Sequence, residues 1–328
     1  MAGNIEITSR IVKRIPLDRL MDLKVDYAFK QLFGNEPNQE ITIVFLNAVL
    51  KRTGQDRITG ISFTNLEAGG EYAEDKQSRL DLLVVTEKGE WINVEIQFNN
   101  QYDMVARSLF YWASVYRNQM RKKMAYRELN PVITVNLMNF NLFHQTDSFH
   151  TTFCLYEQEK RFRLTDMMEM HFVEMPKLIR AWKEGKLDPR DDVLARWLLL
   201  LGIVDQRNGE IYDDILKELE EIAMKDESLH QAFESWESLS RSPEEIYAYE
   251  SRLKRILDEE AVVREAELRG EERGEKRGEK KGAEKGEKRT LRKMARYMLS
   301  NGIEAEKVAE ETGLKLQEVL EIQAETHN

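Results

Sequence analysis

Three side chains that could support metal-dependent hydrolysis lie close together between residues 78 and 99. Asp81 lies in one strand-like run, and Glu95 and Gln97 lie in the next, VEIQF, where they alternate with apolar residues. Because successive side chains of a strand point to opposite faces, Glu95 and Gln97 share one face. Carboxylate and amide oxygens are hard ligands that suit Mg²⁺ or Mn²⁺, and such an ion can activate water for phosphodiester hydrolysis. The pattern therefore indicates Asp81 and Glu95 as metal ligands beside Gln97.

The turn between the two runs decides whether the carboxylates meet. A regular turn over 87–89, with an odd number of residues, places Asp81 opposite Glu95 on the same face, with β-carbons about 5 Å apart. An even turn would place Asp81 opposite Ile96 and separate the carboxylates. Adjacent carboxylates repel each other, and a divalent cation would remove that repulsion. The alternative is that both lie on an exposed sheet face and have no chemical role.

Helices and strands alternate around this hairpin. Apolar residues at helical spacing predict helices, and period-two or β-branched runs predict strands. This order favours an α/β fold with a mixed central sheet flanked by helices, followed by an all-α C-terminal region. The predicted helices are 22–33, 40–50 and 103–124, and the predicted strands are 58–66, 79–86, 91–98, 131–139, 151–156 and 171–174.

The long helix over 103–124 carries a polar stripe among apolar residues. Arg107, Tyr111, Ser114 and Asn118 recur at i, i+4, i+7 and i+11. If the stripe faces the polar side of the sheet, Arg107 could donate charge-assisted hydrogen bonds to a scissile phosphate. If it faces solvent, it is an ordinary exposed helix surface.

Composition excludes several classes of protein. The formal net charge of −10 has the wrong sign for binding nucleic acid by bulk electrostatics, so any phosphate-binding surface is local. The longest apolar stretch, 197–204, is far shorter than the roughly 20 residues that span a bilayer, and the N-terminus lacks a secretory apolar region. We therefore expect a cytoplasmic protein without a membrane partner. Cys154 is the only cysteine, which excludes an internal disulfide and a Cys-rich zinc site.

The histidines give no recognisable signature. None of the five follows HExxH or HNH-like spacing, so the sequence assigns them no role. They are His144, His150, His171, His230 and His327.

The C-terminal third is strongly charged and glycine-marked. A long helix is expected to open at Pro243, and within it glycine recurs every fourth residue from Gly270 to Gly286. This stripe could form a self-association seam, or the tract could be a flexible charged linker, since glycine costs roughly 1 kcal/mol per helical position. Short helical runs follow over 291–323. Ala309 and Gly313, four residues apart, resemble the close-packed turn of a helix-turn-helix motif. Acidic residues on the next helix would repel DNA phosphates, so a packing or dimerisation role is favoured over sequence-specific DNA binding.

An ordered set of motifs resembles the PD-(D/E)xK nuclease superfamily. The closer resemblance is to its Rpn family of recombination-promoting nucleases, also described as transposases. Together the motifs cover most of residues 20–200. They are DLKVDYAFKQLFG at 22–34, FLNAVL at 45–50, SRLDLLV at 78–84, NVEIQFNNQ at 93–101, RSLFYWASVYRNQM at 107–120, LNPVITVNLMNFNLF at 129–143 and HFVEMPKL at 171–178.

The resemblance implies a restriction-endonuclease-like core and a Mg²⁺-dependent site. Asp81 and Glu95 take the positions of the metal ligands, and Gln97 takes that of the motif lysine. Asp26 matches the acidic residue on the first helix that can complete the metal shell, although an i,i+4 pair with Lys30 is the alternative. Glutamine cannot act as a cation, so Lys30 or Arg107 would have to supply the positive charge.

The resemblance also implies a bacterial endonuclease that acts on DNA, in recombination, mobile elements or phage defence. The alternative is a catalytically weak or inactive nuclease fold that serves as an oligomeric scaffold. We expect a homo-oligomer, most simply a dimer through the C-terminal helices, and no small-molecule cofactor. The expected segments are a nuclease-like domain at 18–185, a helical extension at 186–242, the charged helix at 243–288 and a small helical module at 289–328.

Overall fold

A mixed six-stranded sheet is the centre of the protein, seen here in a computed structural model that describes residues 11–12, 15–64, 67–68, 78–98 and 103–326. Its strands, in spatial order, are β1 (Ile61–Phe63), β4 (Leu82–Thr86), β5 (Trp91–Gln97), β6 (Val132–Met138), β8 (Met168–Glu174) and β7 (His150–Cys154). The pairs β5–β6 and β6–β8 are parallel, and the other three pairs are antiparallel. The predicted α/β class with a mixed sheet is confirmed.

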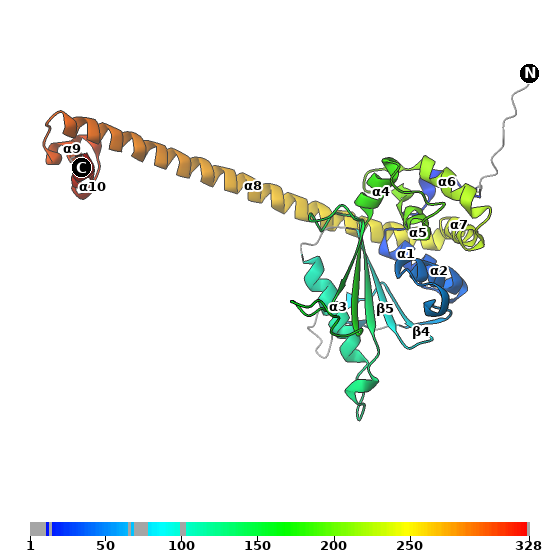
Figure 1. The fold of residues 1–328 in the computed structure, drawn as a ribbon. Coiled ribbons are helices and arrows are strands. Elements are labelled where there is room, and N and C mark those ends of the chain that lie inside the picture. Colours follow the sequence, from blue (N-terminus) through cyan, green and yellow to red (C-terminus); the bar gives the residue numbers. More distant parts are fainter. Residues whose placement is uncertain (1–10, 13–14, 65–66, 69–77, 99–102, 327–328) are drawn as a thin grey trace, which may run out of the picture. The chain divides into compact units, whose positions relative to one another are not determined.

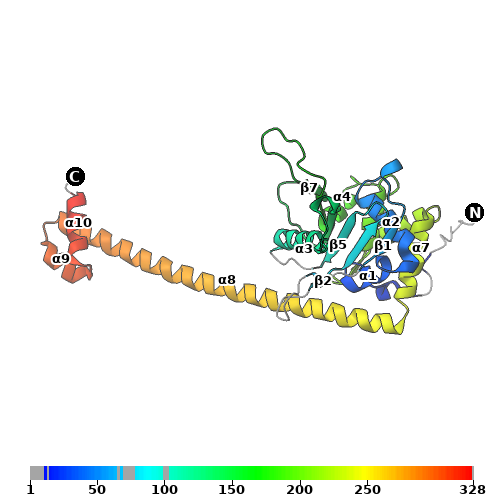
Figure 2. The ribbon, with the colours of Figure 1, turned by 90° about the horizontal axis from the view of Figure 1, so that it is seen from below.

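Helices cover both faces of the sheet (Figures 1 and 2). α3 (Met104–Asn118) lies on one face, and α1 (Asp26–Phe33) and α2 (Gln39–Val49) lie on the other. The main apolar core lies on the α1 and α2 side, where large aromatic side chains from several helices meet. The remaining α-helices are α4 (Met175–Lys183), α5 (Val193–Gly202), α6 (Asp213–Ala223), α7 (Glu227–Leu239), α8 (Pro243–Ser300), α9 (Ala305–Thr312) and α10 (Leu316–Thr326). Two short antiparallel strand pairs complete the secondary structure. They are β2 (Glu67–Ala68) with β3 (Ser78–Arg79) and β9 (Val204–Asp205) with β10 (Glu210–Ile211).

The β4–β5 hairpin has the register that an odd turn predicts. The backbone N–H of Thr86 donates to the carbonyl of Glu90 at 2.9 Å, and the ladder continues to Leu82 opposite Val94. Gly89 has φ +84°, a left-handed conformation that glycine adopts at little cost in a hairpin turn.

The first compact unit of the chain is Met1–Asp258. This boundary differs from the expected divisions at 185 and 242 because later helices share the core of the sheet. Trp197 of α5 contacts Phe33 of α1 with ring centroids 6.2 Å apart, and Tyr249 at the start of α8 is buried in the same core.

The second unit, Glu259–Asn328, contains the rest of α8 together with α9 and α10. Its small core includes Ala295, Val308 and Ile322, whereas Leu316 and Leu320 are exposed. The glycine tract is helical, and a β-carbon added at any of its five glycines would meet nothing within 4 Å. Self-association of this unit stays a prediction. Within the described part of the chain, no helix is both long and apolar enough to cross a membrane.

We predict that the beginning of α8 is required for the stability of the first unit. A chain ending at Ser242 loses the buried side chains of Tyr249 and Ile256. Its free energy of unfolding should fall by at least about 3 kcal/mol, as for deletion of large core side chains. A chain ending at Asp258 should unfold at the same denaturant midpoint as the first unit of the full chain. Equal midpoints for both truncated chains would contradict the division at Asp258.

Candidate functional site

Asp81 and Glu95 lie at the end of the β4–β5 ladder. The pair Leu82 and Val94 closes the regular register, and the next position places Asp81 opposite Glu95. Oδ2 of Asp81 accepts a hydrogen bond from the backbone N–H of Ile96 at 2.9 Å. Glu95 is only 1% exposed, and its carboxylate accepts hydrogen bonds from the Asp81 backbone N–H and from Nδ2 of Asn93, the latter at 3.2 Å. The alternative of two carboxylates on an exposed sheet face does not hold for Glu95.

The pKa values of both carboxylates are raised. Burial raises the pKa of Asp81 to about 7, and the nearby carboxylate of Asp26 adds to the rise. Burial also raises the pKa of Glu95 well above its usual range, and the charge of Asp81 raises it further. Ionising both groups is therefore costly unless a cation compensates for their charge.

Arg107 of α3 supplies part of that compensation, because its charge lowers the pKa of both Asp81 and Glu95. Its guanidinium lies 5.2 Å from the ring centroid of Tyr111, within cation–π range. Tyr111 is 4% exposed and lies in an apolar cluster under α3.

The polar stripe of α3 faces the sheet over its first turns. Tyr111 and Ser114 are buried, whereas Asn118 is exposed. A further contact anchors the helix beside the carboxylates, where the Ser108 hydroxyl donates to Oδ1 of Asn136 at 2.8 Å. Asn136 lies in β6, directly beside Glu95 in the parallel register.

Among the described contacts, Asp26 does not form the alternative i,i+4 pair with Lys30. Nε of Arg252 donates to both carboxylate oxygens of Asp26, at 2.7 and 2.8 Å, and Arg252 also lowers the pKa of Asp81. Lys30 is exposed and is no ion-pair partner of Asp26 in the described part of the chain. Arg252 is 226 residues away in sequence, so helix spacing on α1 could not reveal it.

Gln97 shares the face of Glu95 and is 8% exposed. The same face contains two buried oxygens, Oδ1 of Asn93 and Oγ1 of Thr134, without a hydrogen-bond partner among the described residues. Buried polar atoms are rarely left unsatisfied, so this layer has unused capacity to accept hydrogen bonds. Asn93 could have been found from the sequence, because it alternates with Glu95 and Gln97 in NVEIQ.

A cavity of about 500 Å³ opens at the carboxyl ends of the parallel strands, lined among others by Asn139, Lys183 and Arg207. Asn139 directly follows β6, and its backbone N–H donates to the carbonyl of Gln97 at 2.9 Å. The cavity therefore places cationic side chains at the edge of the sheet where the parallel strands end.

Comparison with known families is decisive at this point. The family model described as PD-(D/E)XK nuclease family transposase matches residues 23–266, which is more than half of the chain. The chain belongs to this family. Searches of curated proteins and of solved structures found no match. The match begins just before Asp26 and ends in α8 shortly after Arg252, so it includes both partners of that ion pair.

Membership in the PD-(D/E)XK nuclease family transposases supports a function related to nucleases and transposases. Divalent metal ions are typical of these nucleases, and a site for such an ion needs several oxygen ligands close together. In the described ranges, no group of three or more His, Cys, Asp or Glu side chains is arranged to hold a metal ion. Both oxygens of Asp26 face Arg252. Asp81 and Glu95 remain as two hard donors whose pKa values are raised, first by burial and then by a neighbouring carboxylate, and this fits a cation such as Mg²⁺, which retains several waters.

We predict that binding of Mg²⁺ at Asp81 raises the free energy of unfolding in a way that depends on pH. From the ordinary pKa of 3.8 up to about 7, the folded protein holds a proton that the unfolded chain has lost. The free energy of unfolding of metal-free protein should therefore fall as pH rises through this interval. Thermal scans should show a larger stabilisation by Mg²⁺ at about pH 7.5 than at about pH 5, where protonation competes with the ion.

Asp81→Asn should remove most of the Mg²⁺ effect, whereas Glu87→Gln, an exposed carboxylate at the turn of the same hairpin, should keep it. An equal Mg²⁺ shift in all three proteins would show that the ion binds elsewhere.

Proposed function

We propose that this protein is a Mg²⁺-dependent DNA endonuclease that can also use Mn²⁺. The observation that carries the proposal is the register of β4 and β5, which brings Asp81 beside the buried Glu95, within the electrostatic range of Arg107. Family membership supports nuclease chemistry independently of this geometry.

Asp81 and Glu95 would hold the metal ion, and Asp26 would act through Asp81 and Arg252 at the edge of the site. The bound ion would polarise the scissile phosphate and lower the pKa of an attacking water. The side-chain amide of Gln97 would orient that water by hydrogen bonding, since it neither ionises nor accepts a proton in this pH range. Cationic residues of the cavity beside Asn139 would contact the flanking phosphates, which reconciles an acidic protein with a DNA substrate.

Arg107 is the proposed replacement for the motif lysine. It already lowers the pKa of both carboxylates, and Tyr111 restricts its guanidinium. Lys30 is less suitable, because it is exposed and has no described contact with the carboxylate pair. Arg107 would thus stabilise negative charge that develops on the phosphate in the transition state. The printed family description, a nuclease family transposase, supports recombination or mobile elements as the context.

We predict that Asp81→Asn and Glu95→Gln each reduce nicking of supercoiled plasmid in Mg²⁺ by at least about 100-fold, because each removes a metal ligand. Glu87→Gln is the matched control on the same hairpin and should nick at the wild-type rate. Circular dichroism should confirm that all variants are folded. If the wild type and both site variants nick equally, or none nicks, the endonuclease proposal is wrong and the oligomeric scaffold is favoured.

A second prediction concerns the source of the positive charge. Arg107→Ala should lower the nicking rate by about 100-fold, the size expected for loss of one preorganised transition-state contact. Arg117→Ala, an exposed arginine on the same helix, serves as the control. Adding Gln97→Lys to Arg107→Ala should restore part of the rate, since it returns a cation to the motif position. Unchanged activity of Arg107→Ala would exclude Arg107 from this role.

A further inference from the structure

A second group of polar side chains lies on the opposite face of the sheet from Glu95. His171 of β8 lies in register with Val135 and Val94, whereas Glu95 aligns with Asn136 and Phe172. Nε2 of His171 lies 2.8 Å from Oε1 of Glu169, and its Nδ1 lies 2.9 Å from Nε2 of His150. Glu169, His171 and His150 thus form a continuous hydrogen-bonded chain, which we call the histidine relay.

The direction of the hydrogen bonds in the histidine relay follows from chemistry. Hydrogen bonding to His171 lowers the pKa of Glu169 to about 2, so this carboxylate is ionised and only accepts. His171 therefore donates through Nε2, and one proton is shared between its Nδ1 and Nε2 of His150. His150 is neutral near pH 7, because burial and the charges of His171 and Lys51 lower its pKa to about 4. Nδ1 of His150 is buried and has no hydrogen-bond partner among the described residues.

His150 lines a cavity of about 780 Å³ between the end of α2, the segment before β7 and the start of α5. Lys51 and Arg57 also line it, and neither forms an ion pair within the described ranges. One wall of the cavity is apolar and includes Val44, Phe149 and Leu194. Asp191, which comes just before α5, also lines the cavity. The cavity thus combines unpaired cations, an apolar wall and acceptors of hydrogen bonds.

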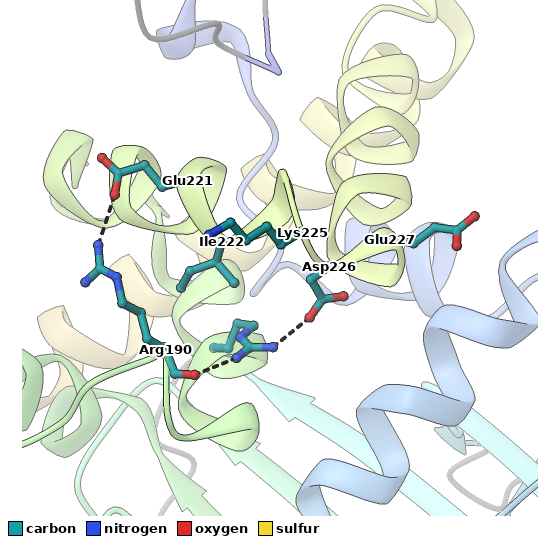
Figure 3. A pocket seen from close by; sticks show the side chains of 7 residues that line it. Arg190, Glu221, Ile222, Lys225, Asp226 and Glu227 are labelled. Carbon is teal, nitrogen blue, oxygen red and sulfur yellow. Dashed lines mark hydrogen bonds and ion pairs between the residues drawn. The ribbon is translucent and has the colours of Figure 1, made fainter.

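Another cavity of comparable size has less unpaired positive charge (Figure 3). It has about 650 Å³, and both arginines that line it already have partners. Arg190 pairs with Glu221 at 3.0 Å, and Arg196 pairs with Asp226 at 2.6 Å. Lys225 is the one lining cation that forms no ion pair within the described ranges.

Lys51 also has an unusual backbone conformation, with φ +53° directly after the end of α2. Its N–H donates to the carbonyl of Ala48 at 3.2 Å, and the N–H of Arg52 donates to Asn47 at 2.9 Å. Glycine is favoured where a helix ends in this left-handed conformation. A lysine here places a cation at the cavity despite its conformational cost, and strain of this kind is associated with functional sites.

We propose that this cavity binds a nucleoside monophosphate, with Lys51 and Arg57 pairing with the phosphate and Nδ1 of His150 forming a hydrogen bond with a ligand hydroxyl. The apolar wall packs against the base, and the carboxylate of Asp191 accepts from a sugar hydroxyl. Glu169 and His171 are positioning residues, because they fix the orientation of the His150 ring. The nucleotide is either free or the phosphorylated 5′ end of a nucleic-acid strand. The site is independent of the proposed endonuclease centre.

Calorimetric titration of the full chain tests this proposal, in EDTA so that no strand is hydrolysed. The probes are 5′-AMP, adenosine, inorganic phosphate, and a tetradeoxynucleotide with and without a 5′ phosphate. We expect 5′-AMP to bind more tightly than adenosine or inorganic phosphate, because only the nucleotide occupies both the cationic and the apolar parts. Tighter binding of the phosphorylated tetranucleotide than of 5′-AMP would identify a strand end as the source, and the reverse order would identify a free nucleotide.

Lys51→Gly is the informative variant, because it removes the cation and relieves the left-handed backbone, so the fold is retained. It should weaken 5′-AMP binding by about tenfold, the effect of losing one charge-assisted hydrogen bond. Lys123→Gly is its matched control, since Lys123 is an exposed lysine with φ +72° outside this cavity. Its affinity for 5′-AMP should equal that of the wild type.

His150→Phe keeps the ring volume, and Thr152, whose hydroxyl lies 3.3 Å from Nδ1 of His171, can still form a hydrogen bond with that atom. It should weaken 5′-AMP binding without changing the affinity for inorganic phosphate. The proposal is overturned if 5′-AMP binds no more tightly than adenosine, or if Lys51→Gly and Lys123→Gly bind 5′-AMP equally well.

Discussion

The proximity of two carboxylates at the end of the β4–β5 hairpin is the constraint on which the rest of the site depends. Removing Asp81 and Glu95 from water makes each charge more expensive, and placing them opposite each other adds repulsion. The pairing of β4 with β5 nevertheless fixes this arrangement, because a shift by one residue would turn every core side chain of the hairpin to the wrong face. The surrounding protein therefore has to supply positive charge.

That charge comes from two helices far apart in sequence. Arg107 approaches from α3 on one face of the sheet, and Arg252 approaches from α8 through its pair with Asp26. α8 can deliver Arg252 only because its first turns are anchored in the main core. Tyr249 is buried there, and its hydroxyl accepts from the backbone N–H of Asp22 at 2.9 Å. This explains physically why the first unit, and the family match, extend beyond the sheet into α8.

The two faces of the sheet divide polar chemistry between them. The α3 face combines the carboxylate pair with buried amides such as Asn93 and Asn136, whereas the opposite face is mainly apolar. The histidine relay is an exception on that apolar face, and it lies where the edge strand β7 leaves His150 beside a cavity. A single sheet thus separates two polar clusters by one layer of backbone.

The sequence by itself determined the α/β class and the strands of the hairpin, because side-chain alternation is a local property. It left the opposition of Asp81 and Glu95 to depend on an odd turn, and the structure supplied that turn. It also indicated the stripe of α3 that carries Arg107. Only the tertiary structure decided the partner of Asp26, the burial of Tyr111 and the inclusion of α5 to α8 in one core, since these depend on contacts between distant segments. The histidine relay was likewise invisible, because Glu169, His171 and His150 come together only when β7 pairs with β8. Periodicity shows which face a side chain occupies, and the packing of distant elements decides what it meets there.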